Sequence, residues 1–148
     1  MISVHPVIKG RIDLPRYVWL APPIELITAL GALPVGMMLM TDPTGSAISL
    51  PADWIANSPF GNYFIPGVYL FVMNGLGMLV ALGLTAMRHW FAPWWTGTLA
   101  VGLIVWILVQ LLVMPETMWL QWFFLGSGLI LGFIALFWLR RTGQLRLW

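Results

Sequence analysis

The chain has 148 residues, of which 60% are hydrophobic and only 8% are charged. A soluble domain usually has about 25% charged residues, so this composition predicts an integral membrane protein. The net charge is +2, but no basic stripe interleaves with aromatic residues, which argues against nucleic-acid binding. Because there is no cysteine, thiol–disulfide exchange, iron–sulfur ligation and cysteine-based zinc sites are excluded.

Four apolar segments dominate the chain, and each is close to the roughly 20 residues that a helix needs to cross a bilayer. A basic arm, residues 1–16, precedes them, and a basic tail, residues 140–148, follows them. The segments cover residues 17–40, 65–87, 91–114 and 118–139. We therefore predict one integral membrane domain over residues 1–148, an all-α bundle of four transmembrane helices.

The charged residues predict an orientation for this bundle. All seven Lys and Arg residues lie on one side of the four-segment pattern, and the connections on the other side carry only acids. Basic residues beside membrane spans stay on the cytoplasmic side, so we expect both termini in the cytoplasm and a multi-pass protein of the inner (plasma) membrane. The basic residues are Lys9, Arg11, Arg16, Arg88, Arg140, Arg141 and Arg146, and the outer acids are Asp42, Asp53 and Glu116.

The N-terminal arm does not have the pattern of a signal peptide. It alternates apolar and charged residues, and Pro6 and Pro15 interrupt it, whereas a signal peptide has a continuous apolar core before a cleavage site. We expect the arm to lie near the lipid headgroups, where its basic residues gain about 1 kcal/mol each from anionic lipid.

The first segment contains three prolines and a carboxylate. Pro22, Pro23 and Pro34 each remove a backbone donor, which predicts a helix that is kinked or begins late. Glu25 lies between them, and a charge within hydrocarbon costs about 2.5–3.5 kcal/mol. Two interpretations of Glu25 are open: a structural role, in which it reaches water, pairs with a cation or is capped by polar groups near the cytoplasmic edge, or a role in handling a proton or substrate. The cationic candidates on its side of the membrane are Arg16, Arg88 and His89.

The connection over residues 41–64 is rich in turn residues. Asp42, Pro43 and Gly45 fit a tight turn, because Asp bonds its own backbone, Pro presets φ and Gly accepts a positive φ. Pro51 and Asp53 suit the first turn of a helix. We predict a short interfacial helix here, resting on the outer membrane surface through Leu50, Trp54 and Ile55.

The end of this connection is predicted to anchor the chain at the membrane surface. Pro59 ends the short helix, and the aromatic residues that follow sit at the interface. Pro66 and Gly67 then open the second segment, because proline is tolerated in a first helical turn. The residues predicted to be structural in and around the outer loop are Asp42, Pro43, Gly45, Pro59, Phe60, Pro66 and Gly67.

Polar side chains also lie inside the later segments: Asn74, Gln110 and Gln121. Gln110 and Gln121 flank a turn at residues 115–117, whose shortness predicts an antiparallel hairpin. Such side chains often hydrogen-bond between helices, at about 0.6 kcal/mol each, and contact with a ligand is the alternative. On the same hairpin, Gly128 and Gly132 form a GxxxG pair, which predicts a close helix contact.

Most of the ten tryptophans fall at interface levels, where they anchor membrane spans. Trp106 lies deeper and is predicted either to pack in the core or to form the wall of a cofactor or lipid pocket. His89, beside Arg88, is expected to contact headgroups, with ligation of a metal centre shared with a partner as the alternative. The only other histidine is His5, and we predict neither a metal site nor a cofactor.

Several short motifs resemble those of one protein group. They are Asp42-Pro43-Thr44-Gly45, Ser58-Pro59-Phe60-Gly61 followed by Ile65-Pro66-Gly67, and Trp106-Ile107-Leu108-Val109-Gln110. Together they resemble a group of small four-span bacterial integral membrane proteins to which no activity is assigned. The resemblance covers about residues 20–135. It implies a bacterial inner-membrane location and adds no catalytic residue.

The sequence favours a non-enzymatic integral membrane protein, either an accessory or structural subunit or a homo-oligomeric bundle. It offers no catalytic set, it has helix faces of small residues, and its outer connections are too short to form a domain. The expected partners are the lipid bilayer and further copies of the chain or a larger membrane complex. No substrate is indicated.

A small proton-linked transporter or carrier is the alternative. It would use Glu25 as its titrating group and the proline-broken first helix as its moving part. A lipid-modifying enzyme would need His, Asp or Glu clustered at one interface, and the outer acids Asp42, Asp53 and Glu116 have no partner base.

Overall fold

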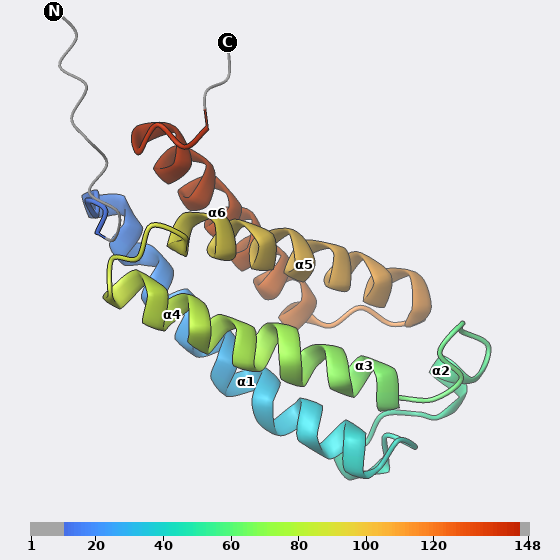
Figure 1. The fold of residues 1–148 in the computed structure, drawn as a ribbon. Helices are drawn as coiled ribbons and strands as arrows, with labels where there is room; N and C mark the ends of the chain where they lie inside the picture. The colour runs from blue at the N-terminus through green and yellow to red at the C-terminus, as the bar shows by residue number, and fades with distance from the viewer. Residues whose placement is uncertain (1–10, 146–148) are drawn as a thin grey trace, which may run out of the picture.

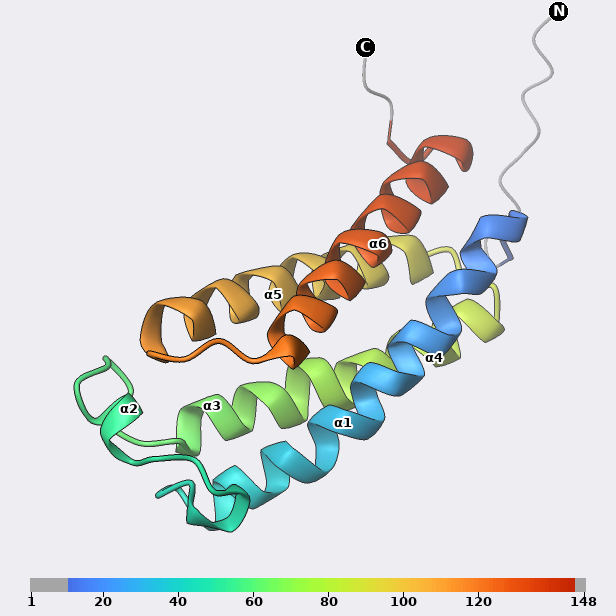
Figure 2. The ribbon, with the colours of Figure 1, turned by 180° about the vertical axis from the view of Figure 1, so that it is seen from behind.

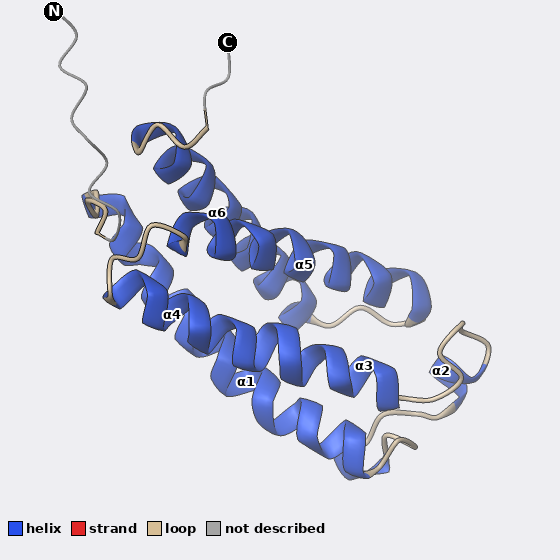
Figure 3. Cartoon of the chain, in the orientation of Figure 1, coloured by secondary structure: helices blue, strands red, loops and turns tan. Residues whose placement is uncertain are grey.

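The computed structural model describes residues 11–145. Over these residues the regular secondary structure is helical, with loops between the helices and an isolated bridge between Arg11 and His89 (Figure 3). Four helical stretches are long and apolar enough to cross a membrane, and their bounds lie within a few residues of the predicted segments (Figure 1). They are Arg16–Thr41, Phe64–Ala86, Ala92–Val113 and Trp119–Arg141. The prediction of a four-helix chain compatible with a multi-pass membrane protein is confirmed.

The first stretch changes its helical type where the prolines lie. It begins as the 3₁₀ helix η1 (Arg16–Leu20) and continues as α1 (Ala21–Thr41). Pro22 and Pro23 occupy the first turn of α1, where the missing N–H groups would have no helical partner in any case. The α-helix thus begins late, as the prolines predict, while Pro34 lies inside it.

The second stretch is not the regular helix that the sequence predicts. It consists of α3 (Phe64–Tyr69), the π-helical segment η3 (Leu70–Gly77) and α4 (Met78–Ala86). A π-helix bonds i to i+5, is rare, and occurs frequently at functional sites. The buried residues of η3 are Asn74, Gly75 and Gly77. The π-helical segment η3 therefore places the polar side chain of Asn74 inside the bundle.

The helices form two antiparallel pairs. The first span pairs with the α3–η3–α4 span, and α5 (Ala92–Val113) pairs with α6 (Trp119–Arg141). The start of η1, the α4–α5 connection and the end of α6 lie together at one end of the bundle, which we call the terminal end (Figures 1 and 2). The α1–α3 connection and the α5–α6 connection lie at the other end, the loop end. Which end faces the cytoplasm stays a prediction.

Glycines set the closest approaches within each pair. In the first pair, Gly36 of α1 faces Gly67 of α3 backbone to backbone. In the second pair, a Cβ on Gly128 of α6 would lie 2.9 Å from Ile104 Cγ1 of α5, and one on Gly132 would lie 3.8 Å from Ala100 Cβ. The predicted GxxxG contact face is therefore the α5–α6 interface.

The loop at residues 42–63 folds back onto the bundle. It contains the 3₁₀ turn η2 (Ser46–Ile48) and the single α-helical turn α2 (Asp53–Ala56). Ile55 is only 4% exposed and packs with Leu39 and Tyr63. The prediction that Ile55 rests on the membrane surface is therefore wrong for this side chain. An interfacial position for α2 itself stays a prediction.

Candidate functional site

Glu25 lies in the interior of the bundle. Its exposed fraction is 0%, and the same face of α1 buries Ala21, Thr28 and Ala32, as the helical repeat requires. Thr96 of α5 is 1% exposed, and its hydroxyl donates a hydrogen bond of 2.9 Å to Glu25 Oε1. This contact joins the two helix pairs. Glu25 Oε2 has no hydrogen-bond partner among the described residues.

Within residues 11–145 Glu25 has Thr96 as its hydrogen-bond partner and no ion pair with a cation, so this conformation shows capping by a polar group and not the expected pairing with Arg16, Arg88 or His89. Arg16 and Arg88 are exposed side chains at the terminal end, and His89 Nδ1 instead accepts the backbone N–H of Phe91 at 3.2 Å. A threonine hydroxyl thus takes the place of the expected guanidinium or imidazole. Burying an ionised carboxylate without a cation costs several kcal/mol. The charged form of Glu25 is therefore strongly disfavoured at this position.

Other buried polar atoms in the bundle also lack hydrogen-bond partners within residues 11–145. Asn74 is 2% exposed, and both its amide oxygen and its amide nitrogen are unpartnered. The hydroxyl of Thr85 is 1% exposed and unpartnered as well. Buried polar groups are normally hydrogen-bonded, and exceptions often mark water or ion positions. The prediction that Asn74 bonds to another helix finds no such bond here.

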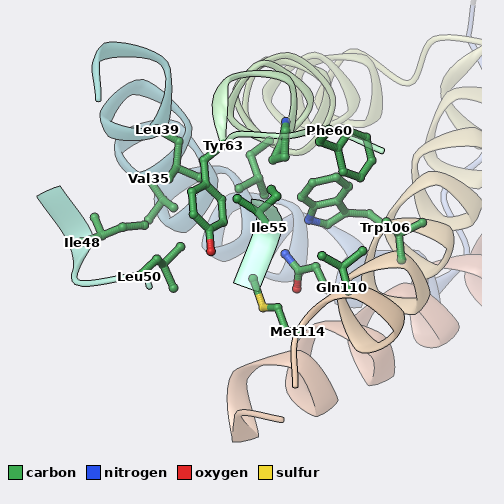
Figure 4. Close-up of a pocket in the computed structure, with 14 residues that line it drawn as sticks. Val35, Leu39, Ile48, Leu50, Ile55, Phe60, Tyr63, Trp106, Gln110 and Met114 are labelled. Atoms are coloured by element: carbon green, nitrogen blue, oxygen red, sulfur yellow. The ribbon is translucent and has the colours of Figure 1, made fainter. Parts of the chain in front are cut away.

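A separate cavity of about 100 Å³ opens between the two helix pairs toward the loop end. Figure 4 shows Val35 and Leu39 of α1 on one side and Trp106 and Gln110 of α5 on the other. The outer loop closes it with five side chains that are mostly apolar. Those residues are Ile48, Leu50, Ile55, Phe60 and Tyr63. A cavity of this volume has room for a few water molecules or for one small apolar molecule.

Trp106 forms a wall of this cavity and is also part of the core. It is 7% exposed and stacks on Tyr69 with ring centroids 4.8 Å apart, so it packs in the core, while a cofactor or lipid in the cavity stays a prediction. The Tyr69 hydroxyl donates to the Gly102 carbonyl at 2.9 Å, while Trp106 Nε1 is a buried donor without a partner in the described chain. In the same way, Trp95 Nε1 donates to the Gly77 carbonyl of η3 at 3.1 Å. The Tyr69 contacts hold α3 against α5, and the Trp95–Gly77 bond holds η3 against α5.

A largely apolar layer, which also contains the buried amide of Asn74, separates the cavity from Glu25. Two residues that line the cavity measure the separation. Val35 lies ten residues after Glu25 in α1, and Trp106 lies ten residues after Thr96 in α5. At 1.5 Å per residue, both helices place the cavity floor about 15 Å from the Glu25–Thr96 pair. Buried side chains fill the interval: Ala29, Ala32, Met78, Leu99, Leu103 and Leu131. The cavity and the carboxyl group are therefore not connected in this conformation.

The two glutamines of the α5–α6 hairpin serve different purposes. Gln110 lines the cavity. Gln121 begins α6, since its Oε1 accepts the Met118 N–H at 3.0 Å, and its Nε2 reaches Met114 Sδ at 3.5 Å. The predicted antiparallel hairpin is present, but the two side chains make no hydrogen bond to each other. Gln121 is therefore a capping residue, and the sequence does not indicate this because a methionine stands at the position where a capping box has Ser or Thr.

Asp42 organises the start of the outer loop. Its Oδ1 accepts the Thr44 hydroxyl at 2.6 Å and the Thr44 N–H at 3.2 Å, and its Oδ2 accepts the Ser46 hydroxyl at 2.5 Å and the Ala47 N–H at 2.9 Å. The hydrogen bond from Ser46, followed by those from Thr44 and Ala47, lowers the pKa of Asp42 to about 2. The turn that the sequence predicts is therefore held by an ionised carboxylate.

Tyr63 connects this turn to the second helix. Its N–H donates to the Pro43 carbonyl at 2.9 Å and its hydroxyl to the Pro51 carbonyl at 2.8 Å. Gly45 adopts φ +83°, and a Cβ there would lie 2.8 Å from the Tyr63 ring. Burial raises the pKa of Tyr63, and the charge of Asp53 raises it further. Hydrogen bonds and packing around Tyr63 thus hold the loop in a defined conformation.

The remaining predicted loop residues divide into buried and exposed ones. Phe60 and Pro66 line the cavity, and Gly67 is buried against α1. Pro59 is exposed at the surface. The Ser58 N–H donates to the Ile55 carbonyl at 3.0 Å, so the chain does turn there after α2.

Sequence reasoning missed Thr96, Thr85 and Tyr69 as site residues. Thr96 stands 71 positions from Glu25, and no local pattern indicates that pairing. Within residues 11–145 there is no group of three or more His, Asp or Glu side chains placed to hold a metal ion. Through the carboxyl group of Glu25, the buried polar groups can hold a proton, water or a small cation.

Comparison with protein-family models, with curated proteins and with solved structures gives no match for this chain. The assignment of function therefore rests on the residues and their geometry alone.

Proposed function

We propose that the protein is a small proton-linked carrier of the membrane, with Glu25 as its proton-binding group. One observation carries the proposal: Glu25 is fully buried and hydrogen-bonded to Thr96, with its second oxygen unpartnered in the described chain. An intramembrane carboxyl group without a structural counter-ion is a functional group by default. The structural alternative is that Glu25 is only capped by polar groups such as Thr96, and the experiment below distinguishes the two.

Ionisation of Glu25 would be coupled to a rearrangement. In this conformation a carboxylate at Glu25 would be unpaired and dry, which costs several kcal/mol. Loss of the proton therefore requires entry of water or a cation, or a shift of the helices. The first span has a 3₁₀ start and an internal Pro34, and the second contains η3, so both spans of the first pair have irregular sections where such movement can be localised.

The cavity at the loop end suits the same proposal. It stops about 15 Å short of Glu25, behind Trp106 and Tyr69. A carrier that admits its substrate from alternate sides needs such a closed layer in each of its end states. On this proposal the conformation described is one in which the path from the loop end to Glu25 is closed.

The test uses proteoliposomes that contain a pH-sensitive dye. After an imposed pH step, the wild type is expected to equilibrate protons faster than protein-free liposomes, and Glu25→Gln is expected to return the rate to the protein-free level. Glu116→Gln is the matched control, since Glu116 is an exposed glutamate of the loop end. Equal rates for the wild type and Glu25→Gln would refute the proposal.

A non-enzymatic accessory subunit or homo-oligomer is the second candidate. Exposed apolar side chains at the loop end of the α5–α6 pair favour it, because they offer a surface to another helix as well as to lipid. Leu112 is 87% exposed, Trp119 75% and Trp122 58%. The size and composition of the complex extracted in a mild detergent test this candidate, and a stoichiometric second polypeptide would support it.

The membrane in which the protein lies, and its orientation there, are part of the proposal. We infer an inner membrane of bacterial type with the terminal end in the cytoplasm. The arginines at that end support this orientation, through the rule that basic residues remain inside.

A further inference from the structure

A groove runs along α6 at the terminal end of the bundle. It has a volume of about 670 Å³, and its walls are apolar along most of its length. Ile130, Phe133 and Phe137 of α6 line it and are 47%, 61% and 53% exposed. Their spacing of three and four residues places them in one stripe along the helix. Arg140 and Arg141 end the stripe, and both are exposed.

The length of this stripe suits one lipid chain. From Ile130 to Arg140 there are ten residues, which corresponds to about 15 Å of helix. That is about half of the roughly 30 Å hydrocarbon thickness of a bilayer, the depth of one leaflet. An acyl chain lying along the stripe would therefore bring its headgroup to the arginines.

Tyr17 of η1 adds a hydrogen-bonding group to the same groove. It lines the groove opposite the α6 stripe, and its hydroxyl is buried without a hydrogen-bond partner in the described chain. A phenol hydroxyl donates well to a phosphate oxygen, and two adjacent guanidinium groups favour an anion. The groove thus combines an apolar channel with a cationic, hydrogen-bonding mouth.

We propose that this groove is a specific site for an anionic phospholipid of the leaflet at the terminal end. Arg140 and Arg141 bind the phosphate, and one acyl chain lies along Phe133 and Phe137. The Tyr17 hydroxyl, which is buried in this conformation, donates to a phosphate or ester oxygen after lipid binding displaces the side chains that cover it. Basic pockets between membrane helices recognise anionic headgroups in this way. The site is separate from Glu25 and does not depend on the proposed carrier function.

The experiment measures lipid bound to the purified full chain by native mass spectrometry after exchange into mixed phosphatidylglycerol and phosphatidylcholine micelles. Wild type should retain phosphatidylglycerol in preference to phosphatidylcholine. Arg140→Gln with Arg141→Gln should reduce that preference about tenfold or more, because two charge-assisted contacts are lost. Tyr17→Phe should reduce it about threefold, since it loses a single hydrogen bond.

Arg88→Gln is the matched control, because Arg88 is another exposed arginine of the terminal end that does not line the groove. Its preference should stay within about twofold of wild type. If Arg88→Gln and the double variant lost the preference for phosphatidylglycerol equally, the preference would come from general surface charge, and the proposal would be overturned. Equal retention of both lipids by the wild type would also overturn it. If the double variant does not fold, Tyr17→Phe decides, and an unchanged preference in that variant counts against the site.

Discussion

Gly36 of α1 and Gly67 of α3 touch through their backbones. A Cβ on Gly36 would lie 2.9 Å from the Gly67 carbonyl oxygen, and a Cβ on Gly67 would lie 3.0 Å from the Gly36 carbonyl oxygen. Backbone atoms cannot swing aside as a flexible side chain can, so any side chain at either position forces the two helices apart. This contact sets how closely the first helix pair packs near the loop end.

Gly36→Ala and Gly67→Ala are therefore expected to destabilise the bundle by about 1–3 kcal/mol, the usual cost of overpacking. The measurement is the thermal unfolding of the protein in detergent, followed by size exclusion and circular dichroism. Gly83→Ala is the control, because a Cβ there meets no atom within 4 Å and alanine favours a helix by up to about 1 kcal/mol. Equal unfolding temperatures for Gly36→Ala and Gly83→Ala would show that the helices do not cross at Gly36.

The α5–α6 interface gives a second comparison between glycines of one helix. A Cβ on Gly128 would come within 2.9 Å of Ile104, whereas one on Gly132 would lie at the ordinary distance of 3.8 Å from Ala100. Gly128→Ala should lower the yield of folded protein, while Gly132→Ala should be tolerated. Gly132→Leu should again lower the yield, because its longer side chain meets α5. If Gly132→Leu behaves like wild type, this face is not the contact face.

The positions of the four long helices could be predicted from the sequence, but the contacts between the helices inside the bundle could not. The apolar segments, the late start after Pro22 and Pro23, the turn at Asp42 and the antiparallel hairpin of α5 and α6 all follow from local patterns that act over a few residues. The π-helical segment around Asn74 is different. Its turns depend on tertiary contacts, among them the bond from Trp95 to Gly77, so a local pattern does not predict it.

The site itself was predicted only in part. Glu25 stands out in the sequence because a carboxylate in hydrocarbon is costly. Thr96, its hydrogen-bond partner, does not stand out in the sequence, because threonine is an ordinary residue in an apolar helix. Only the packing of the two helix pairs brings Thr96 to Glu25. Charge complementarity favoured an arginine partner, but the exposed arginines remain at the terminal end, where water solvates them.

The outer loop should lose its structure in acid. The hydrogen bonds that Asp42 accepts in the fold lower its pKa to about 2, from an ordinary value of 3.8. Its contribution is therefore fully present above about pH 4 and is lost as the pH falls through 2. The unfolding temperature of wild type should exceed that of Asp42→Asn at pH 7, and the difference should shrink between pH 4 and pH 2. A difference that is constant over this range would contradict the role of the carboxylate.

The orientation of the bundle can be tested with single cysteines, since the chain has none of its own. Ala47 is an exposed residue of the loop end, and Gln144 lies at the terminal end. On intact cells, an impermeant thiol reagent should label Ala47→Cys and spare Gln144→Cys until the membrane is opened. Labelling of position 144 alone would reverse the predicted orientation.

Thr96 should influence Glu25 through their hydrogen bond. Thr96→Val removes the hydroxyl that donates to Glu25 Oε1 and keeps the shape of the side chain. In the infrared, the C=O stretch of protonated Glu25 should move to higher frequency in this variant. Thr98→Val is the control on the same helix, because the Thr98 hydroxyl bonds only to the Trp94 carbonyl. A frequency shift of equal size in both variants would argue against the pairing.

The central claim is that Glu25 exchanges a proton, and an infrared titration of the protein in liposomes tests it most directly. The difference between wild type and Glu25→Gln isolates the carboxyl band of Glu25, and circular dichroism of each sample establishes that the protein stays folded. We predict a C=O band that is present at low pH and disappears as the pH is raised, while the same band is missing in Glu25→Gln. A Glu25 signal that does not change at any pH at which the protein stays folded would contradict the claim, and Glu25 would then be a structural group.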